Sequence, residues 1–302
     1  MALTLVLVPH FLNSSYLVDV LISCLLFGTL GATFDLSVGY MGLLNFGFAG
    51  FIGIGAYASA LLAINLGVSP WLGLLIGGVA SATVGLLVGA LTLRLRGIFV
   101  AMVTWFVAEI VKSTMSNLEQ FTGGYRGLVV PGFPSIEIGS LTINMSSITD
   151  IPEYYLILCL SISILIVLYL IVNSKLGLAF KAIREDEMAS EVLGLHTTRY
   201  NVLNLTLSCF FAGTLGSFFV HYLGFLDPDL LGVATTIEVL TYTYVGGRAT
   251  LWGSFLASFI LIGFLELARP LLISRLIFYG ALLILVMLLF PTGLAGIFKK
   301  RV

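Results

Sequence analysis

Charged side chains in this 302-residue chain are concentrated in one segment, from Ser174 to Tyr200, with long apolar runs on either side. The segment holds eight of the 14 basic and 15 acidic residues: Lys175, Lys181, Arg184, Glu185, Asp186, Glu187, Glu191 and Arg199. Carboxylate and guanidinium groups gathered in this way form charge-assisted hydrogen bonds with a second surface. We call residues 174–200 the charged segment and expect its chemistry to be recognition of a partner.

The apolar residues of the charged segment recur at steps of three and four, which predicts an amphipathic helix or a pair of short helices ending at Gly194. One alternative is a helix lying on lipid headgroups, but such helices carry mainly Lys and Arg on the polar face. The acidic run Glu185-Asp186-Glu187 favours docking on a protein instead. The expected docking contacts are Arg184, Glu185, Asp186 and Glu187 through charge, and Met188 and Val192 through apolar surface, with Gly194 as the stop.

Glycine and isolated polar residues mark two further segments, Phe34–Ala60 and Val245–Gly253. Glycine allows helices to approach closely, and it also allows a helix to break where the backbone is buried or lines a cavity. Close helix packing alone and lining of a transport pathway both remain open. Two similar breaks in the two halves of the chain suggest an internal duplication. The pathway or hinge candidates are Asp35, Gly39, Gly42, Asn45, Gly47, Gly50, Gly246 and Gly247.

The elements that must position these residues are membrane-spanning helices. Hydrophobic residues make up 59% of the chain, against roughly 45–50% in soluble domains, and charged residues 10%, against roughly 25%. A net charge of −1 gives no support to nucleic-acid binding. We therefore expect an all-α polytopic membrane protein with about eight to ten transmembrane helices. Spanning stretches are predicted at 18–40, 42–66, 70–93, 97–117, 153–173, 200–224, 231–246, 251–270 and 273–294, and residues 1–12 are too short to span.

Ionisable residues within the predicted spans are costly and therefore are functional candidates. They include Asp35, Glu109, Lys112 and Glu238. Glu109 and Lys112 lie three residues apart on one predicted helix and could neutralise each other. The sequence contains no nucleophile elbow, no phosphate loop and no metal-ligand spacing, and its three cysteines lie far apart. We therefore expect no catalysis, no metal and no cofactor in this chain.

The direction of insertion is predicted by the basic residues, which concentrate on the cytoplasmic side of membrane proteins. They cluster at Arg94 and Arg96, in the charged segment and at Lys299–Arg301, whereas residues 118–152 carry three acids, with Glu153 next to them, and only Arg126. The chain is thus expected to be a single transmembrane domain over 1–302. Its charged segment lies in the cytoplasm, residues 118–152 form an external loop, and the N-terminus is external.

Several blocks of the sequence resemble one known family. KAIREDEMASEVLG, followed by TTRYNVLNLTLSCFFAGTLGS, is similar to the coupling segment and next helix of branched-chain amino acid ABC transporter permeases of the LivM type. Further blocks resemble that family in order over roughly residues 20–298: LSVGYMGLLNFGFAGFIGIGAY, LTLRLRGIFVAMVTWFVAEIV, TGGYRGL, VGGRATLWGSFLASF and FYGALLILVMLLFPTGL.

The resemblance implies a type II-like ABC importer permease in the prokaryotic plasma (inner) membrane. Such a subunit pairs with a second, LivH-like permease, with two cytoplasmic ABC ATPase subunits that bind ATP and Mg, and with an extracytoplasmic solute-binding protein. Arg184, Glu185, Asp186, Glu187, Met188, Val192 and Gly194 would then couple the chain to the ATPases.

The sequence departs from the family pattern in one place and leaves the solute open. Coupling segments often carry an E-A-A…G signature, where this chain has Met188-Ala189-Ser190 and Gly194, so the acidic position is displaced to Glu187. Branched-chain or related amino acids are the favoured solutes. Urea or amides, nucleosides and sugars are alternatives, as is a stand-alone secondary transporter without an ATPase.

Overall fold

The computed structural model describes residues 15–92, 98–138, 141–143, 151–269, 280–281, 284–286, 288 and 293–297. In this part the chain is all-helical, as predicted, with only four very short strands. The helices are α2 (Ser15–Val38), α3 (Phe48–Leu66), α4 (Pro70–Leu91), α5 (Ile98–Asn117), α6 (Glu119–Thr122), α7 (Ile151–Val172), α8 (Lys175–Glu185), α9 (Glu187–Val192), α10 (Thr197–Leu223), α11 (Val233–Gly246) and α12 (Leu251–Leu267).

The described residues contain six helices that are long and apolar enough to cross a membrane, or seven if α11 and α12 count as one span bent by 112°. Eight of the predicted spanning stretches correspond to α2, α3, α4, α5, α7, α10, α11 and α12. The stretch 273–294 lies largely outside the described residues, as do residues 1–12, Arg94, Arg96 and Lys299–Arg301. The predicted total of eight to ten helices therefore stays a prediction.

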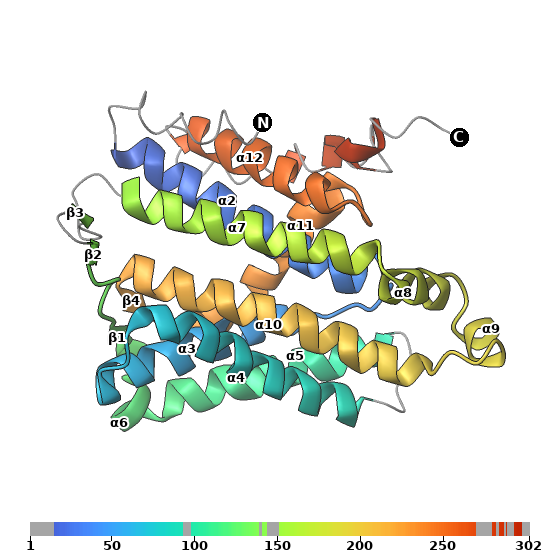
Figure 1. Cartoon of the computed structure of the whole chain (residues 1–302), viewed down its shortest axis with the longest axis horizontal. Coiled ribbons are helices and arrows are strands. Elements are labelled where there is room, and N and C mark those ends of the chain that lie inside the picture. The colour runs from blue at the N-terminus through green and yellow to red at the C-terminus, as the bar shows by residue number, and fades with distance from the viewer. Residues whose placement is uncertain are drawn as a thin grey trace.

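The helices form one bundle in which α10 packs against α4 and α3, while α2 packs against α12, α7 and α11 (Figure 1). α2 and α10 also contact each other and join the two groups. Small residues allow the close approach of α3, α4 and α10: a Cβ on Gly77 would lie 2.6 Å from the Gly55 carbonyl oxygen, and Ser217 donates to that oxygen at 3.0 Å. Such packing is typical of helices that associate in lipid.

Short elements occupy the two ends of the bundle. At one end lie α8 and α9, and at the opposite end lie the antiparallel pairs β1 (Leu128–Val129) with β4 (Phe225–Leu226) and β2 (Ile136–Ile138) with β3 (Leu141–Ile143) (Figure 1). The remaining short elements are the 3-10 turns η1 (Gly124–Arg126), η2 (Pro228–Leu231) and η4 (Leu294–Ile297). The charged segment and the predicted external loop are thus at opposite ends of the spans.

The charged segment folds into the predicted pair of short helices. Ser174 caps α8 by accepting from the Leu176 N–H at 3.2 Å, and Asp186 caps α9 by accepting from the Ala189 N–H at 3.0 Å. Gly194 has a φ of +90°, and the Leu195 N–H donates to the Ser190 carbonyl at 3.0 Å. This left-handed glycine ends α9, as the sequence predicted.

Candidate functional site

One buried carboxylate connects the two glycine-rich segments. Asp35 is fully buried near the end of α2. Its Oδ1 accepts from the Ala249 N–H and its Oδ2 from the Thr250 N–H, both at 2.9 Å. Those N–H groups belong to the break between α11 and α12. Two candidate hinges that the sequence presented separately therefore meet at Asp35.

The break itself has an uncommon backbone. α11 ends at Gly246, Gly247 has a φ of +108°, and Ala249, at +58°, is the one residue other than glycine with a positive φ in the described residues. Thr250 Oγ1 donates to the Gly247 carbonyl. Positive φ costs free energy in a residue with a side chain, so this turn persists because neighbouring groups hold it. The two oxygens of Asp35 are such groups.

The charged segment contacts the same place through Arg184. Its Nη1 donates to the Gly39 carbonyl oxygen at 2.6 Å, and Lys181 Nζ lies 5.7 Å from the centre of the Tyr40 ring. Gly39 has no room for a side chain, because a Cβ there would meet Asp35 Oδ1 and come within 2.5 Å of the Ala249 nitrogen. α8, the end of α2 and the α11–α12 break are therefore in direct contact.

The remaining glycine candidates serve different purposes. Residues 39–47 are not helical, and Gly42, with a φ of +76°, is the glycine in this segment whose backbone a side chain would strain. A Cβ on Gly50 would lie 2.6 Å from the Ala108 Cβ, and one on Gly47 would meet the Thr104 carbonyl, so both allow close packing of α3 against α5. For Gly47 and Gly50 the structure thus favours the packing interpretation.

Asn45 lies within this non-helical segment and is buried. Its Oδ1 accepts from the Gly47 N–H at 3.1 Å, while its Nδ2 has no hydrogen-bond partner in the described part of the chain. Sequence reasoning missed a second asparagine, Asn204 on α10, which accepts from Ser37 Oγ at 2.8 Å and donates to the Leu36 carbonyl at 3.0 Å. The available signal was an asparagine that begins the apolar part of this helix.

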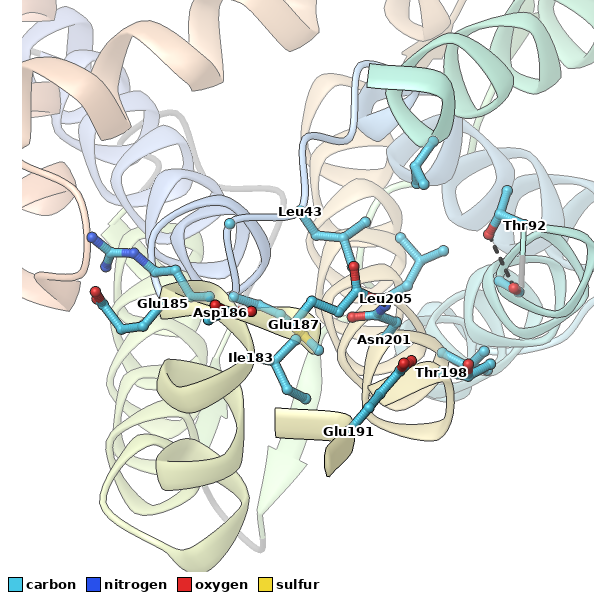
Figure 2. A pocket seen from close by; sticks show the side chains of 16 residues that line it. Leu43, Thr92, Ile183, Glu185, Asp186, Glu187, Glu191, Thr198, Asn201 and Leu205 are labelled. Carbon is cyan, nitrogen blue, oxygen red and sulfur yellow. Dashed lines mark hydrogen bonds between the residues drawn. The ribbon is translucent and has the colours of Figure 1, made fainter. Parts of the chain in front are cut away.

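The acidic residues of the charged segment lie around a cavity of about 280 Å³ between α8, α9, α10 and residues 41–43 (Figure 2). Glu187 accepts from Asn201 Nδ2 at 3.4 Å, and Glu191 accepts from Thr197 Oγ1 at 2.7 Å. Together with the capping role of Asp186, these contacts hold α9 against the start of α10. Glu185 also borders the cavity.

Three apolar side chains of α8 (Ala179, Phe180 and Ile183) are buried, whereas those at α9 lie on the outer surface of the charged segment. Met188 is 68% exposed, Val192 88% and Leu193 82%. Because Arg184, Asp186 and Glu187 all have partners within the chain, the free surface of α9 is more apolar than the sequence suggested.

The ionisable residues of the spans are paired differently from the expectation. Lys112 Nζ lies 2.8 Å from Asp229 of η2, and Glu109 makes no hydrogen bond or ion pair with any described residue. The direct partner of Lys112 is therefore Asp229, 117 residues along the chain, while the charge of Glu109 acts on Lys112 without an ion pair. Glu238 accepts from Tyr242 Oη at 2.7 Å. No group of His, Cys, Asp or Glu in the described ranges is suited to hold a metal ion.

The fold and this arrangement define an integral membrane protein whose broken helices are of the kind that transporters use. The sequence matches the family model described as "Branched-chain amino acid transport system / permease component" over residues 16–290. The chain belongs to this family of transport permeases.

Curated relatives agree with this assignment. The chain is 33% identical to the high-affinity branched-chain amino acid transport system permease protein LivM of Salmonella typhimurium and 32% identical to that of Escherichia coli. Each match covers 94% of this chain and 71% of the relative. The permease protein LivH of Salmonella typhimurium is 26% identical, over 89% of this chain and 92% of that protein. No solved structure matches the chain.

Proposed function

We propose that this chain is a membrane-spanning subunit of an ATP-driven importer for branched-chain or related amino acids in the prokaryotic inner membrane. ATP and Mg would be bound by two separate cytoplasmic ATPase subunits, a second, LivH-like permease would complete the pathway, and an extracytoplasmic binding protein would deliver the solute. Relatives named as branched-chain amino acid permeases support the solute class. The observation that carries the ATP-driven mechanism is the contact of Arg184 and Asp35 with the two helix breaks.

Docking of the ATPase would occur at the free surface of α9. Met188, Val192 and Leu193 form a small exposed apolar group at the tip of the charged segment. Apolar side chains that enter a partner's pocket dominate the energetics of such interfaces. Movement of the ATPases would then displace α9 and, through the Asp186 cap, α8.

Transmission into the membrane would follow the hydrogen bonds already described. α8 holds the Gly39 carbonyl through Arg184, and Asp35, one helical turn earlier, holds the Ala249 and Thr250 N–H groups. A displacement of α8 would thus reach the 112° bend between α11 and α12 without intervening flexible chain. In this mechanism the hinge changes angle when the ATPases close.

The test is the ratio of solute uptake to ATP hydrolysis in liposomes that contain the whole complex. Asp35→Asn replaces one acceptor oxygen with an NH₂ group that faces a peptide N–H, so the turn loses a hydrogen bond and gains a repulsive contact. We expect ATP hydrolysis to continue while uptake per ATP falls about tenfold, equivalent to about 1.4 kcal/mol of lost coupling.

Asp19→Asn is the matched control, since Asp19 also lies on α2 but bonds Tyr222 at the other end of the helix. A wild-type ratio for Asp35→Asn would contradict the proposed transmission. Failure of the wild-type chain to co-purify with any ATPase would instead support a stand-alone transporter. Calorimetry on the associated binding protein, titrated with leucine, urea, a nucleoside and a sugar, distinguishes the solute classes.

A further inference from the structure

A charged surface lies at mid-span on a helix face that nothing in the described chain covers. Only 28% of the α5 span is buried, compared with 67% for α2 and α10. Glu109 is exposed near the middle of this 19-residue span, between the exposed apolar residues Phe106 and Ile110. A carboxylate at this depth is costly against hydrocarbon, so such residues almost always face protein or a water-filled cavity.

Chain that is not α-helical lies beside this face. Between α10 and α11 the chain forms β4 and η2, and it enters the bundle deeply enough for Leu231 to fill the space beside Gly53 of α3. Asp227 caps η2 by accepting from the Asp229 N–H at 2.8 Å. Backbone of this kind is tolerated at membrane depth only where it is buried in protein or lines water.

The side chain of Asp229 is 79% exposed and lies 2.8 Å from Lys112 Nζ, which is 22% exposed. This ion pair therefore sits at the surface of the α5–η2 unit. Glu109 and Lys112 are three residues apart and share one side of α5. We call Glu109, Lys112 and Asp229 the Glu109 face. Lys112 is paired with Asp229 and also interacts electrostatically with Glu109, so the two carboxylates and one ammonium of the Glu109 face carry one excess negative charge.

We propose that the Glu109 face lines the water-filled translocation pathway, and that Glu109 receives the ammonium group of a zwitterionic amino acid as it passes. This inference rests on the proposed transport function. The excess negative charge of this face attracts an ammonium ion, and Glu109 is the carboxylate of the face that makes no hydrogen bond or ion pair with a described residue. An uncharged solute such as urea or a sugar has no ammonium group to make this contact.

The first test is water accessibility, which requires no transport. Cys24, Cys159 and Cys209 are replaced by alanine, and Glu109→Cys is labelled in membranes with a charged, membrane-impermeant methanethiosulfonate. Ile162→Cys is the matched control, because Ile162 is also exposed and near the middle of its span, α7. We expect Glu109→Cys to react at least about tenfold faster, since the reactive thiolate forms in water.

Equal rates at the two positions would overturn the inference. So would labelling of Glu109→Cys only by a lipid-soluble maleimide, which indicates a lipid-facing helix, or labelling by neither reagent, which indicates burial against a partner protein. Asp229→Cys supplies an independent position on the same face and is expected to react like Glu109→Cys. None of these outcomes depends on ATP coupling, so they are separate from a failure of the proposed function.

The second test addresses the ammonium group. Glu109→Gln keeps the size of the side chain and removes its charge, and we expect uptake of leucine to fall about tenfold at equal recovery of the complex. Glu119→Gln is the control, because Glu119 is an exposed carboxylate on α6 at the end of the bundle. Unchanged uptake in Glu109→Gln would show that the carboxylate does not receive the solute.

Discussion

At the scale of single residues, the charged segment contains two groups: residues that hydrogen-bond within the chain and residues whose surface is free for a partner. Arg184, Asp186 and Glu187 have hydrogen-bond partners inside the chain, whereas Met188 and Val192 have most of their surface free. The sequence predicted which residues gather in this segment but assigned all of them to the partner. Hydrogen bonds to Gly39 and Asn201 depend on the tertiary fold, and no local sequence pattern predicts them.

Val192 is 88% exposed on α9, which makes it the first position to test. If this side chain enters an apolar pocket of the ATPase, Val192→Asp would bury an unpaired charge, and recovery of the ATPase with the permease should fall at least about tenfold. The measurement is co-purification at matched permease levels. Leu66→Asp, at an exposed position at the C-terminal end of α3, is the control and should leave recovery unchanged. Equal recovery for both variants would exclude Val192 from the interface.

At the scale of elements, hydropathy located the spans well, because lipid requires long apolar helices. The start of α3 was the main difference. The sequence predicted a span from residue 42, but α3 begins at Phe48, because residues 39–47 form an irregular connection held by Asn45, Asp35 and Arg184. The partner of Lys112 was also missed, since Asp229 comes from a connection far along the chain.

The packing of α3 on α5 yields the second prediction. Gly47 abuts the Thr104 carbonyl, so Gly47→Val must push α5 away or fail to pack. We expect the detergent-solubilised complex to lose thermal stability by several degrees and to lose most of its uptake, because such overpacking typically costs about 1–3 kcal/mol.

Gly263→Val on α12 is the matched control, because a Cβ at Gly263 would have nothing within 4 Å. Normal melting and normal uptake of Gly47→Val would mean that α5 is not held at this distance in the working complex.

At the scale of the whole molecule, the charged segment and the 118–143 region lie at opposite ends of the bundle (Figure 1). The direction of the bundle in the membrane stays a prediction from basic residues. Thr122 lies near the start of the predicted external loop but is only 1% exposed, so its side chain is a poor site for a label. Tyr125, 76% exposed, is a suitable position.

The third prediction is therefore that Tyr125→Cys, in a chain without the three native cysteines, reacts with an impermeant reagent from outside the cell. Val192→Cys should react only after the membrane is opened, because the charged segment is expected in the cytoplasm. Accessibility labelling of intact cells and inside-out vesicles measures both. The reverse pattern would show that the orientation is inverted and that the charged segment lies outside the cell, where no cytoplasmic ATPase can reach it.

The α11–α12 break also bears on how the chain is built into a membrane. α11 has 14 residues and is about 21 Å long, which is shorter than the roughly 30 Å hydrocarbon core. Newly synthesised α11 therefore cannot cross alone, and the start of α12 would present the free N–H groups of Ala249 and Thr250 to lipid. Asp35, made 214 residues before Ala249, is the group that accepts them. We expect biogenesis to be ordered, with α2 inserted first and the bent pair of α11 and α12 folding onto it.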